Sequence, residues 1–232
     1  MKNKIFFIFS LLFLWQPAAQ ALQERHLIII HHAEGEHSIT GIAHSNPKHP
    51  DYQDSRLTAK GKEQAQNTAE RLVLHGFDNR NIAAVFVSPL PSAQETAEII
   101  SDFGIFPREK IIIDDRLIDA QAGDLEGEAL EGHIKDLWHV SQEEVKKYDL
   151  ETNFQVRTRM MQVYDQAQKQ YPEGHIVFIT HGTPAMELLQ DIIQIEVRLN
   201  PAEAYVLPLI ARKSQNTTSN IVASFDSAEQ VG

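Results

Sequence analysis

Two adjacent histidines end an apolar run near the start of the chain, in IIIHHAEGE (residues 28–36). An imidazole titrates close to neutral pH, so it can act as a nucleophile, a proton carrier or a metal ligand. A third histidine, His181, ends a second apolar run, HIVFIT (residues 175–180). Both runs are short and rich in β-branched residues, which is typical of strands buried on both faces of a parallel sheet. Because ligands bind at the carboxyl ends of such strands, these histidines can meet at one site.

The start of a predicted helix after the second apolar run could bind an anionic ligand. Gly182 follows His181 at the predicted start of a helix, where free N–H groups favour an anion.

Predicted strands and helices alternate along most of the chain. The strands are expected at residues 26–30, 82–87, 110–114, 175–180 and 204–209, with one further short candidate at 221–225. The helices are expected at residues 57–76, within 88–100, at about 151–170 and within 180–193. Pro208 places the strand at 204–209 at an edge of the sheet or makes it a strand end. The alternation predicts an α/β fold, a three-layer α/β/α sandwich with a mostly parallel central sheet.

The first residues have the parts of a secretory signal peptide. Two lysines precede an apolar run, and an A-x-A triplet ends at Ala21. The apolar run is short for a membrane span, which needs about 20 residues. We therefore expect a signal peptide at residues 1–21, cleavage after Ala21, and one domain over residues 22–232. The mature protein is then periplasmic or secreted, with no stable membrane span, and an uncleaved N-terminal anchor is the alternative.

The cysteine content and the net charge indicate how the protein is stabilised and which partners are excluded. The chain has no cysteine and a formal net charge of −11. A sizeable hydrophobic core must therefore stabilise the exported protein without disulfides. The acidic balance argues against nucleic acid, whose phosphates need clustered Lys and Arg. The sequence makes no prediction about the oligomeric state.

Five stretches in order carry a resemblance to a known family: HHAEGE, LTAKGKEQA, SPLPSAQETAEII, RLIDAQAGDLEG and THGTP. They resemble the histidine phosphatase superfamily, in the phosphoglycerate-mutase-like branch, whose motifs are RHGE, LTxxGxxQA, SPLxRAxxTA, LxExxxGxxEG and SHG. The match covers nearly all of the mature chain, so it is more specific than any single motif.

The resemblance implies a covalent phosphohistidine mechanism on a small phosphorylated substrate, with no cofactor and no metal. His32 matches the family nucleophile, which splits hydrolysis into two easier steps. His181 matches the second family histidine, which helps to bind the phosphoryl group. Asp119 matches the position of a glutamate that protonates the leaving alkoxide. Glu34 matches the acidic residue of RHGE and is expected to support the nucleophile's surroundings.

Two positions depart from the family pattern. His31 and Ser92 stand where the family has arginines that bind phosphate, and neither replacement is equivalent to a planar, always charged guanidinium. Each lost donor can cost about 2.7–4 kcal/mol of transition-state stabilisation. A protonated His31 beside phosphate would restore one charge at acidic pH, which predicts an acid optimum. Arg25, Arg56 or Arg116 could also fill the vacated space.

Two other interpretations belong to different functional classes. Loss of both arginine positions favours a catalytically inactive relative that binds an acidic ligand or a protein partner. A metal site is the other, with the candidate ligands His31, His32, Glu34, Glu36 and His37. Imidazole and carboxylate suit zinc, but adjacent residues at a strand end are expected to point to opposite faces.

Overall fold

The protein is described here by a computed structural model, which covers residues 24–130, 140–209 and 223–225. The signal peptide predicted at residues 1–21 and its cleavage site lie outside the described residues. The centre of the fold is a six-stranded sheet with the strand order β3-β2-β4-β1-β5-β6. Its strands are β1 (His26–His31), β2 (Ile82–Val87), β3 (Ile111–Ile113), β4 (His175–Thr180), β5 (Ala204–Pro208) and β6 (Ala223–Phe225).

The strand pairings confirm the predicted mostly parallel sheet. Strands β1 and β2 both pair with β4 in parallel, and β2 also pairs with β3 in parallel. Strands β5 and β6 run antiparallel at the other side. Pro208 is the last residue of β5, which lies between β1 and β6, so this proline marks a strand end and not an edge strand.

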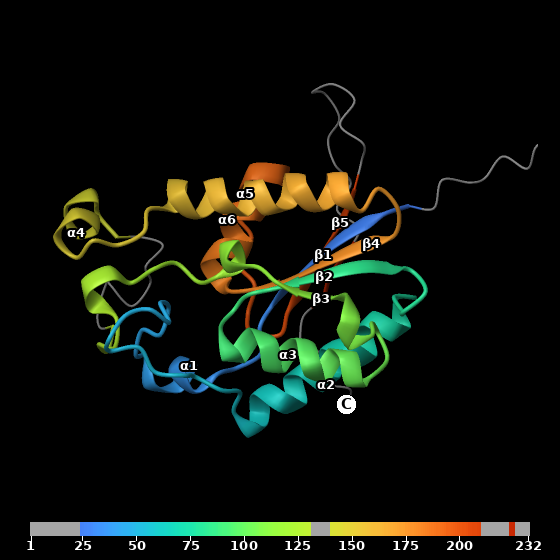
Figure 1. The fold of residues 1–232 in the computed structure, drawn as a ribbon, viewed down its shortest axis with the longest axis horizontal. Coiled ribbons are helices and arrows are strands. Elements are labelled where there is room, and N and C mark those ends of the chain that lie inside the picture. Colours follow the sequence, from blue (N-terminus) through green and yellow to red (C-terminus); the bar gives the residue numbers. More distant parts are fainter. Residues whose placement is uncertain (1–23, 131–139, 210–222, 226–232) are drawn as a thin grey trace, which may run out of the picture.

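Helices cover both faces of the sheet, as Figure 1 shows, with α5 and α6 on one side and α2 and α3 on the other. The helices are α1 (Glu36–Thr40), α2 (Ala59–Leu74), α3 (Pro91–Asp102), α4 (Gln142–Lys147), α5 (Asn153–Gln170) and α6 (Gly182–Ile193). The three-layer α/β/α sandwich is therefore confirmed. Helix α2 begins two residues later than the start of the predicted range, because the Thr58 side chain caps it by accepting a hydrogen bond from Gly61 N.

The two largest hydrophobic clusters of the core lie on opposite faces of the sheet. Leu27 and Ile29 of β1 belong to the cluster that includes residues of α5 and α6. Ile28 and Ile30 belong to the cluster that includes residues of α2 and α3. All four are fully buried. Successive side chains of a strand point to opposite faces, so the continuous apolar run at this strand supplies both clusters.

The carboxyl ends of the three neighbouring strands β2, β4 and β1 lie at one edge of the sheet. The backbone N–H of His32 donates to Thr180 O over 2.9 Å, and that of Ser88 donates to Ile179 O over 3.0 Å. These bonds extend the strand pairing just beyond β1 and β2. His32, Ser88 and His181 therefore come together from three distant parts of the sequence.

Candidate active site

His32 is the first residue after β1, and its ring orientation is fixed by the backbone. Its Nδ1 lies 2.7 Å from Ala33 O, so Nδ1 carries the proton and donates it to this carbonyl. Ala33 N in turn donates to Thr96 Oγ1 of α3 over 3.0 Å. The other ring nitrogen, Nε2, consequently holds a lone pair, which is the form that a nucleophilic imidazole requires.

Three further imidazoles surround His32. Its ring centroid lies 4.7 Å from that of His181, 4.8 Å from that of His31 and 5.2 Å from that of His37. The expectation that adjacent histidines point apart is wrong, because β1 ends at His31 and His32 leaves the strand. Burial, and next the nearby His181, holds the pKa of His32 well below its ordinary value. The ring is therefore neutral over a wide pH range.

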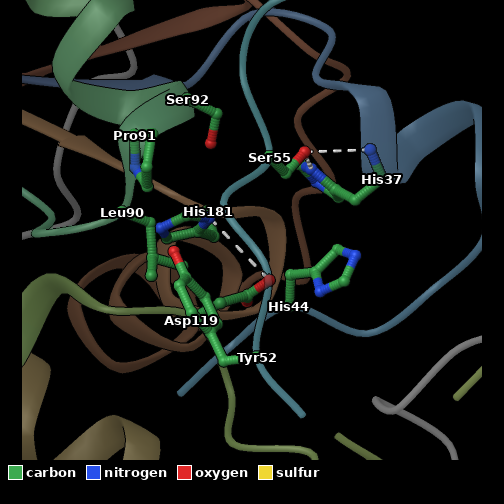
Figure 2. Close-up of a pocket in the computed structure, with 9 residues that line it drawn as sticks. All are labelled: His37, His44, Tyr52, Ser55, Leu90, Pro91, Ser92, Asp119 and His181. Atoms are coloured by element: carbon green, nitrogen blue, oxygen red, sulfur yellow. Dashed lines mark hydrogen bonds and ion pairs between the residues drawn. The ribbon is translucent and has the colours of Figure 1, made fainter. Parts of the chain in front are cut away.

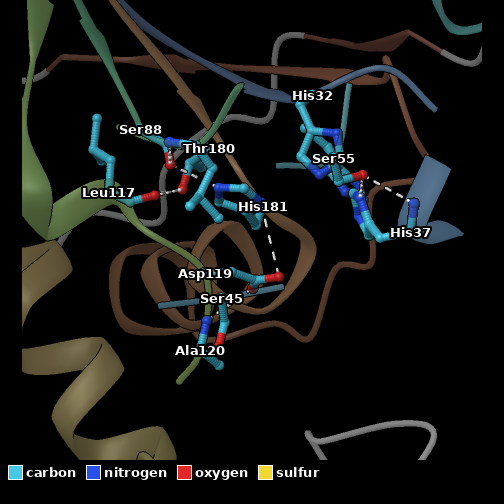
Figure 3. A network of polar contacts seen from close by, with 12 residues as sticks. His32, His37, Ser45, Ser55, Ser88, Leu117, Asp119, Ala120, Thr180 and His181 are labelled. Carbon is cyan, nitrogen blue, oxygen red and sulfur yellow. Dashed lines mark hydrogen bonds and ion pairs between the residues drawn. The ribbon is translucent and has the colours of Figure 1, made fainter. Parts of the chain in front are cut away.

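His181 lies at the N-cap of α6, between the nucleophile candidate and Asp119 (Figure 3). Its Nε2 is 2.7 Å from Ser88 Oγ. Its Nδ1 is buried without a hydrogen-bond partner, and it lies 3.8 Å from Asp119 Oδ2. Ser88 Oγ accepts a hydrogen bond from Leu90 N over 3.3 Å, so its own proton is available for Nε2 and the ring proton lies on Nδ1. An unused donor therefore faces Asp119. An unpaired buried donor is costly, and a phosphoryl oxygen would satisfy it.

Asp119 reaches the site despite its short side chain. It follows the short 3-10 helix Asp115–Leu117, and its Oδ1 accepts a hydrogen bond from Ala120 N over 2.8 Å. Burial raises the pKa of this carboxyl group, although a third of its side chain is exposed at the site. A proton donor for a leaving group benefits from this shift. Sequence reasoning missed Arg159 of α5, which fixes this loop by donating to Asp119 O over 3.1 Å.

A small cavity lies in front of His181 and Asp119 (Figure 2). Its lining residues are His37, His44, Tyr52, Ser55, Leu90, Pro91, Ser92, Asp119 and His181. Its volume is about 10 Å³, which is room for about one water molecule. His32 is 1% exposed and is not one of the residues that line the cavity. A phosphoryl group would need some of these side chains to move outward before it could reach Nε2.

Two helix N-termini supply positive potential at this cavity. Leu90, Pro91 and Ser92 belong to the N-cap and first turn of α3, and His181 caps α6. Figure 2 shows the Ser92 hydroxyl directed into the cavity. Exposed N–H groups and the helix dipole favour an anion at both places. Among the lining residues there is no lysine and no arginine.

His31 lies beside the nucleophile candidate but not in the cavity lining. Its Nδ1 donates to Leu199 O over 2.8 Å. Burial lowers the pKa of His31, while the backbone carbonyl of Leu199 and the carboxylate of Asp119 act in the opposite direction. With its pKa below 6.5, this imidazole is neutral at pH 7. The structure brings it next to His32, but the cavity itself is formed by other residues.

The three arginines considered as substitutes are engaged elsewhere. Arg25 Nε donates to Gly174 O over 3.2 Å. Arg56 pairs with Glu95 over 2.7 Å on the surface, and Arg116 pairs with Asp114 over 2.5 Å. None of the three lines the cavity.

Glu34 connects the end of β1 to the start of α2. Its carboxylate accepts hydrogen bonds from Thr58 Oγ1 over 3.0 Å and from Lys60 Nζ over 2.8 Å. Its backbone N–H donates to Gln64 Oε1 over 2.9 Å. A Cβ atom at Gly61 would lie 2.1 Å from Glu34 O, so α2 packs against this turn only because residue 61 is a glycine. Glu34 thus supports the site without lining the cavity.

The outer wall comes from α1 and the connection over residues 42–55, which sequence reasoning did not assign to phosphate binding. The buried Glu126 holds this connection. Its carboxylate accepts hydrogen bonds from Ser45 N over 2.7 Å, from Ser45 Oγ over 2.6 Å and from Asn46 N over 3.1 Å. Glu126 lies in the GDLEG stretch, and its pairing with a segment some 80 residues away is not visible in the sequence.

A wider hollow of about 410 Å³ adjoins the cavity. It shares three lining residues with the cavity: His37, His44 and Ser55. Its other walls are Glu36, Ile39, Thr40, Ile42, Gln53 and Asp54.

Metal binding was the third interpretation of the histidine cluster. In the part of the chain that the structure describes, no group of three or more His, Cys, Asp or Glu side chains could hold a metal ion. Within the same residues, no helix has the length and apolar character needed to cross a bilayer.

Comparisons with known proteins show what this chain is similar to. The sequence matches the family model of the histidine phosphatase superfamily (branch 1) over residues 27–204. No curated protein matches it. The solved structure of Bacillus stearothermophilus YhfR is similar, with a TM-score of 0.63 and 19% sequence identity, and covers 85% of this chain and 95% of that one.

Two mycobacterial structures are similar to about the same degree. Mycobacterial hydrolase 2 has a TM-score of 0.65 and 16% identity over 88% of this chain and 94% of that one. The glucosyl-3-phosphoglycerate phosphatase Rv2419c, solved in complex with VO3, has a TM-score of 0.59 and 17% identity over 79% and 92%. These likenesses establish the fold, and the family match spans most of the chain. The chain therefore belongs to the histidine phosphatase superfamily (branch 1).

Proposed function

We propose that the protein is a phosphatase that hydrolyses a small phosphomonoester through a phosphohistidine intermediate at His32. One observation carries this proposal. The Nδ1–H group of His32 is bonded to Ala33 O, which leaves Nε2 as a free lone pair among three other imidazoles. Phosphatases among the solved structures of similar fold, such as Rv2419c, support the reaction class.

The reaction proceeds in two steps. In the first, Nε2 of His32 forms a bond to phosphorus, the bond from phosphorus to the substrate oxygen breaks, and Asp119 gives its proton to that oxygen. In the second, a water molecule attacks phosphorus, the N–P bond breaks, and Asp119 takes the proton of the water. His181 Nδ1–H, Ser92 and the N-termini of α3 and α6 stabilise the phosphoryl oxygens. No cofactor takes part in this scheme.

The N-terminal sequence supports a location outside the cytoplasm. We propose that the signal peptide at residues 1–21 exports the protein to the periplasm or the medium. Mutase activity is less expected, because it returns phosphate within a bound sugar acid and needs a strongly charged pocket.

Turnover of a generic phosphomonoester, such as p-nitrophenyl phosphate, tests the function. Wild-type protein is compared with His32→Ala over a range of pH. The control is His75→Ala, which removes an imidazole from an exposed position at the C-cap of α2. We expect His32→Ala to abolish turnover and His75→Ala to leave it unchanged. Equal rates in wild type and His32→Ala would reject the proposal.

A second candidate function follows from the cavity. A volume of about 10 Å³ and the absence of Lys and Arg from its lining favour a catalytically inactive relative that binds a ligand or partner. This alternative predicts no turnover in wild type at any pH, together with measurable binding of a phosphorylated ligand.

A further inference from the structure

We propose that His37 is a phosphate-binding residue that supplies, from α1, the donor that the family obtains from arginine. The proposal rests on the proposed function, because it concerns a ligand of the phosphoryl group at the same site. It replaces His31, the residue that follows from sequence position alone.

His37 is better placed than His31 to contact a phosphoryl group. His37 lines the cavity, together with Ser92, Asp119 and His181, and its ring centroid is 5.2 Å from that of His32. His31 is as close to His32 but does not line the cavity, and its Nδ1 is bound to Leu199 O. His37 also lines the wider hollow, so a group that passes from the hollow into the cavity passes its imidazole.

The His37 ring is held in a fixed orientation. Ser55 Oγ accepts a hydrogen bond from His37 N over 2.9 Å and lies 2.7 Å from His37 Nδ1 (Figure 3). Because the hydroxyl already accepts from the backbone, its own proton is available for Nδ1. This arrangement places the remaining ring proton on Nε2, where it can be donated to an anion. A preorganised donor loses little entropy on binding.

Gly35 supplies the space that the ring occupies. A Cβ atom at this position would lie 2.7 Å from both Cε1 and Nδ1 of His37. The backbone of Gly35 has φ −96° and ψ 166°, a conformation that any residue adopts. The backbone conformation therefore does not require a glycine at position 35. The missing side chain leaves room for the His37 imidazole.

The charges around His37 make it responsive to an anion. The titratable groups that influence it or are influenced by it are His31, His32, His44, His181 and Asp119. Burial lowers the pKa of His37, and Asp119 acts in the opposite direction. A bound phosphate dianion adds negative charge and favours the imidazolium. The ring thus gains a proton as the anion binds.

Binding of inorganic phosphate tests the proposal without requiring turnover. Affinity is measured by calorimetry at mildly acidic pH for wild type, His37→Leu, His31→Leu and the control His75→Leu. A charge-assisted hydrogen bond predicts that His37→Leu weakens binding about 10–100-fold, with a smaller loss in His31→Leu and none in His75→Leu. His37→Arg should retain or raise the affinity, which a packing role would not explain.

Two further measurements test the proposal even if His37→Leu fails to fold. Gly35→Ala keeps every polar group but crowds the His37 ring and, less closely, the Ser55 hydroxyl that orients it, so it should weaken phosphate binding as well. In wild type, ¹⁵N spectra of the histidine rings should show the His37 signals shifting as phosphate is added. Unchanged His37 signals at saturation, or no phosphate binding by wild type, would overturn the proposal.

The result separates this proposal from the phosphatase function. Turnover that is lost in His32→Ala but unchanged in His37→Leu, with unchanged phosphate affinity, rejects the role of His37 and leaves the function standing. Phosphate binding that depends on His37 in a protein without turnover rejects the function and supports the role of His37.

Discussion

His32 and Asp119 have opposite shifts of pKa, and both shifts have the same physical cause. Burial disfavours the charged form of each group, so it lowers the pKa of the imidazole and raises that of the carboxyl group. The first step of the proposed reaction uses the neutral form of both residues. A buried site with few cations therefore favours the protonation states that phosphoryl transfer needs.

The pH dependence of kcat/KM follows from these shifts. His32 must be deprotonated, so the rising limb should have its midpoint below pH 6.5, the ordinary pKa of histidine. Asp119 must be protonated, so the falling limb should have its midpoint above pH 3.8, the ordinary pKa of aspartic acid. Because burial moves the His32 limb to the acid side, we expect the maximum of kcat/KM at acidic pH. Asp119→Asn should lose the falling limb and about 10²–10⁴ in rate. A maximum above neutral pH, or a falling limb that persists in Asp119→Asn, would contradict this assignment.

At the scale of the elements, the contact between α2 and the turn after β1 holds the site in place. Glu34 accepts hydrogen bonds from Thr58 and Lys60 and donates one to Gln64. The LTAKGKEQA stretch thus holds the turn that carries the nucleophile candidate. Gly61 is the point of closest approach.

Gly61→Ala tests this contact. In an open helix the change would stabilise the protein by about 1 kcal/mol, because alanine has the higher helix propensity. Here the added Cβ would lie 2.1 Å from Glu34 O, so we expect a loss of about 1–3 kcal/mol in the free energy of unfolding. Urea denaturation measures this, with Asn67→Ala at an exposed position of α2 as the control that should not destabilise. Stabilisation by Gly61→Ala would show that α2 is free to shift.

The sequence predicted elements and motif positions well, but not the cavity wall. The apolar runs predict β1 and β4. Together with the order of the five motifs, they also predict that His32 and His181 meet. From the sequence, His37 is a candidate only as a metal ligand. Its place in the cavity wall depends on a hydrogen bond to Ser55, 18 residues away. The small volume of the cavity depends on how its side chains pack, and the spacing of motifs does not predict that packing.

At the scale of the whole molecule, the net charge opposes the proposed substrate. The chain carries a formal net charge of −11, while a phosphomonoester is itself an anion. Only groups close to the site offset this negative charge, namely the imidazoles and the N-termini of α3 and α6. Long-range repulsion slows the approach of the substrate, and salt screens it.

We therefore expect kcat/KM for p-nitrophenyl phosphate to rise with ionic strength, by about 2- to 10-fold between low and physiological salt. Phosphocholine, whose ammonium group offsets the charge of the phosphate, should respond less. Steady-state kinetics in a non-coordinating buffer with increasing sodium chloride measure both. A fall of kcat/KM with salt for the anionic substrate would indicate attraction from a positive region not accounted for here.

The most direct measurement is the capture of the covalent intermediate. Wild-type protein is mixed with a phosphomonoester at acidic pH, quenched in base, in which phosphohistidine survives, digested and analysed by mass spectrometry and ³¹P NMR. The account predicts a phosphoryl group on Nε2 of His32, absent from His32→Ala. A phosphoryl group on His31, His37 or His181, or sustained turnover with no labelled histidine, would contradict it.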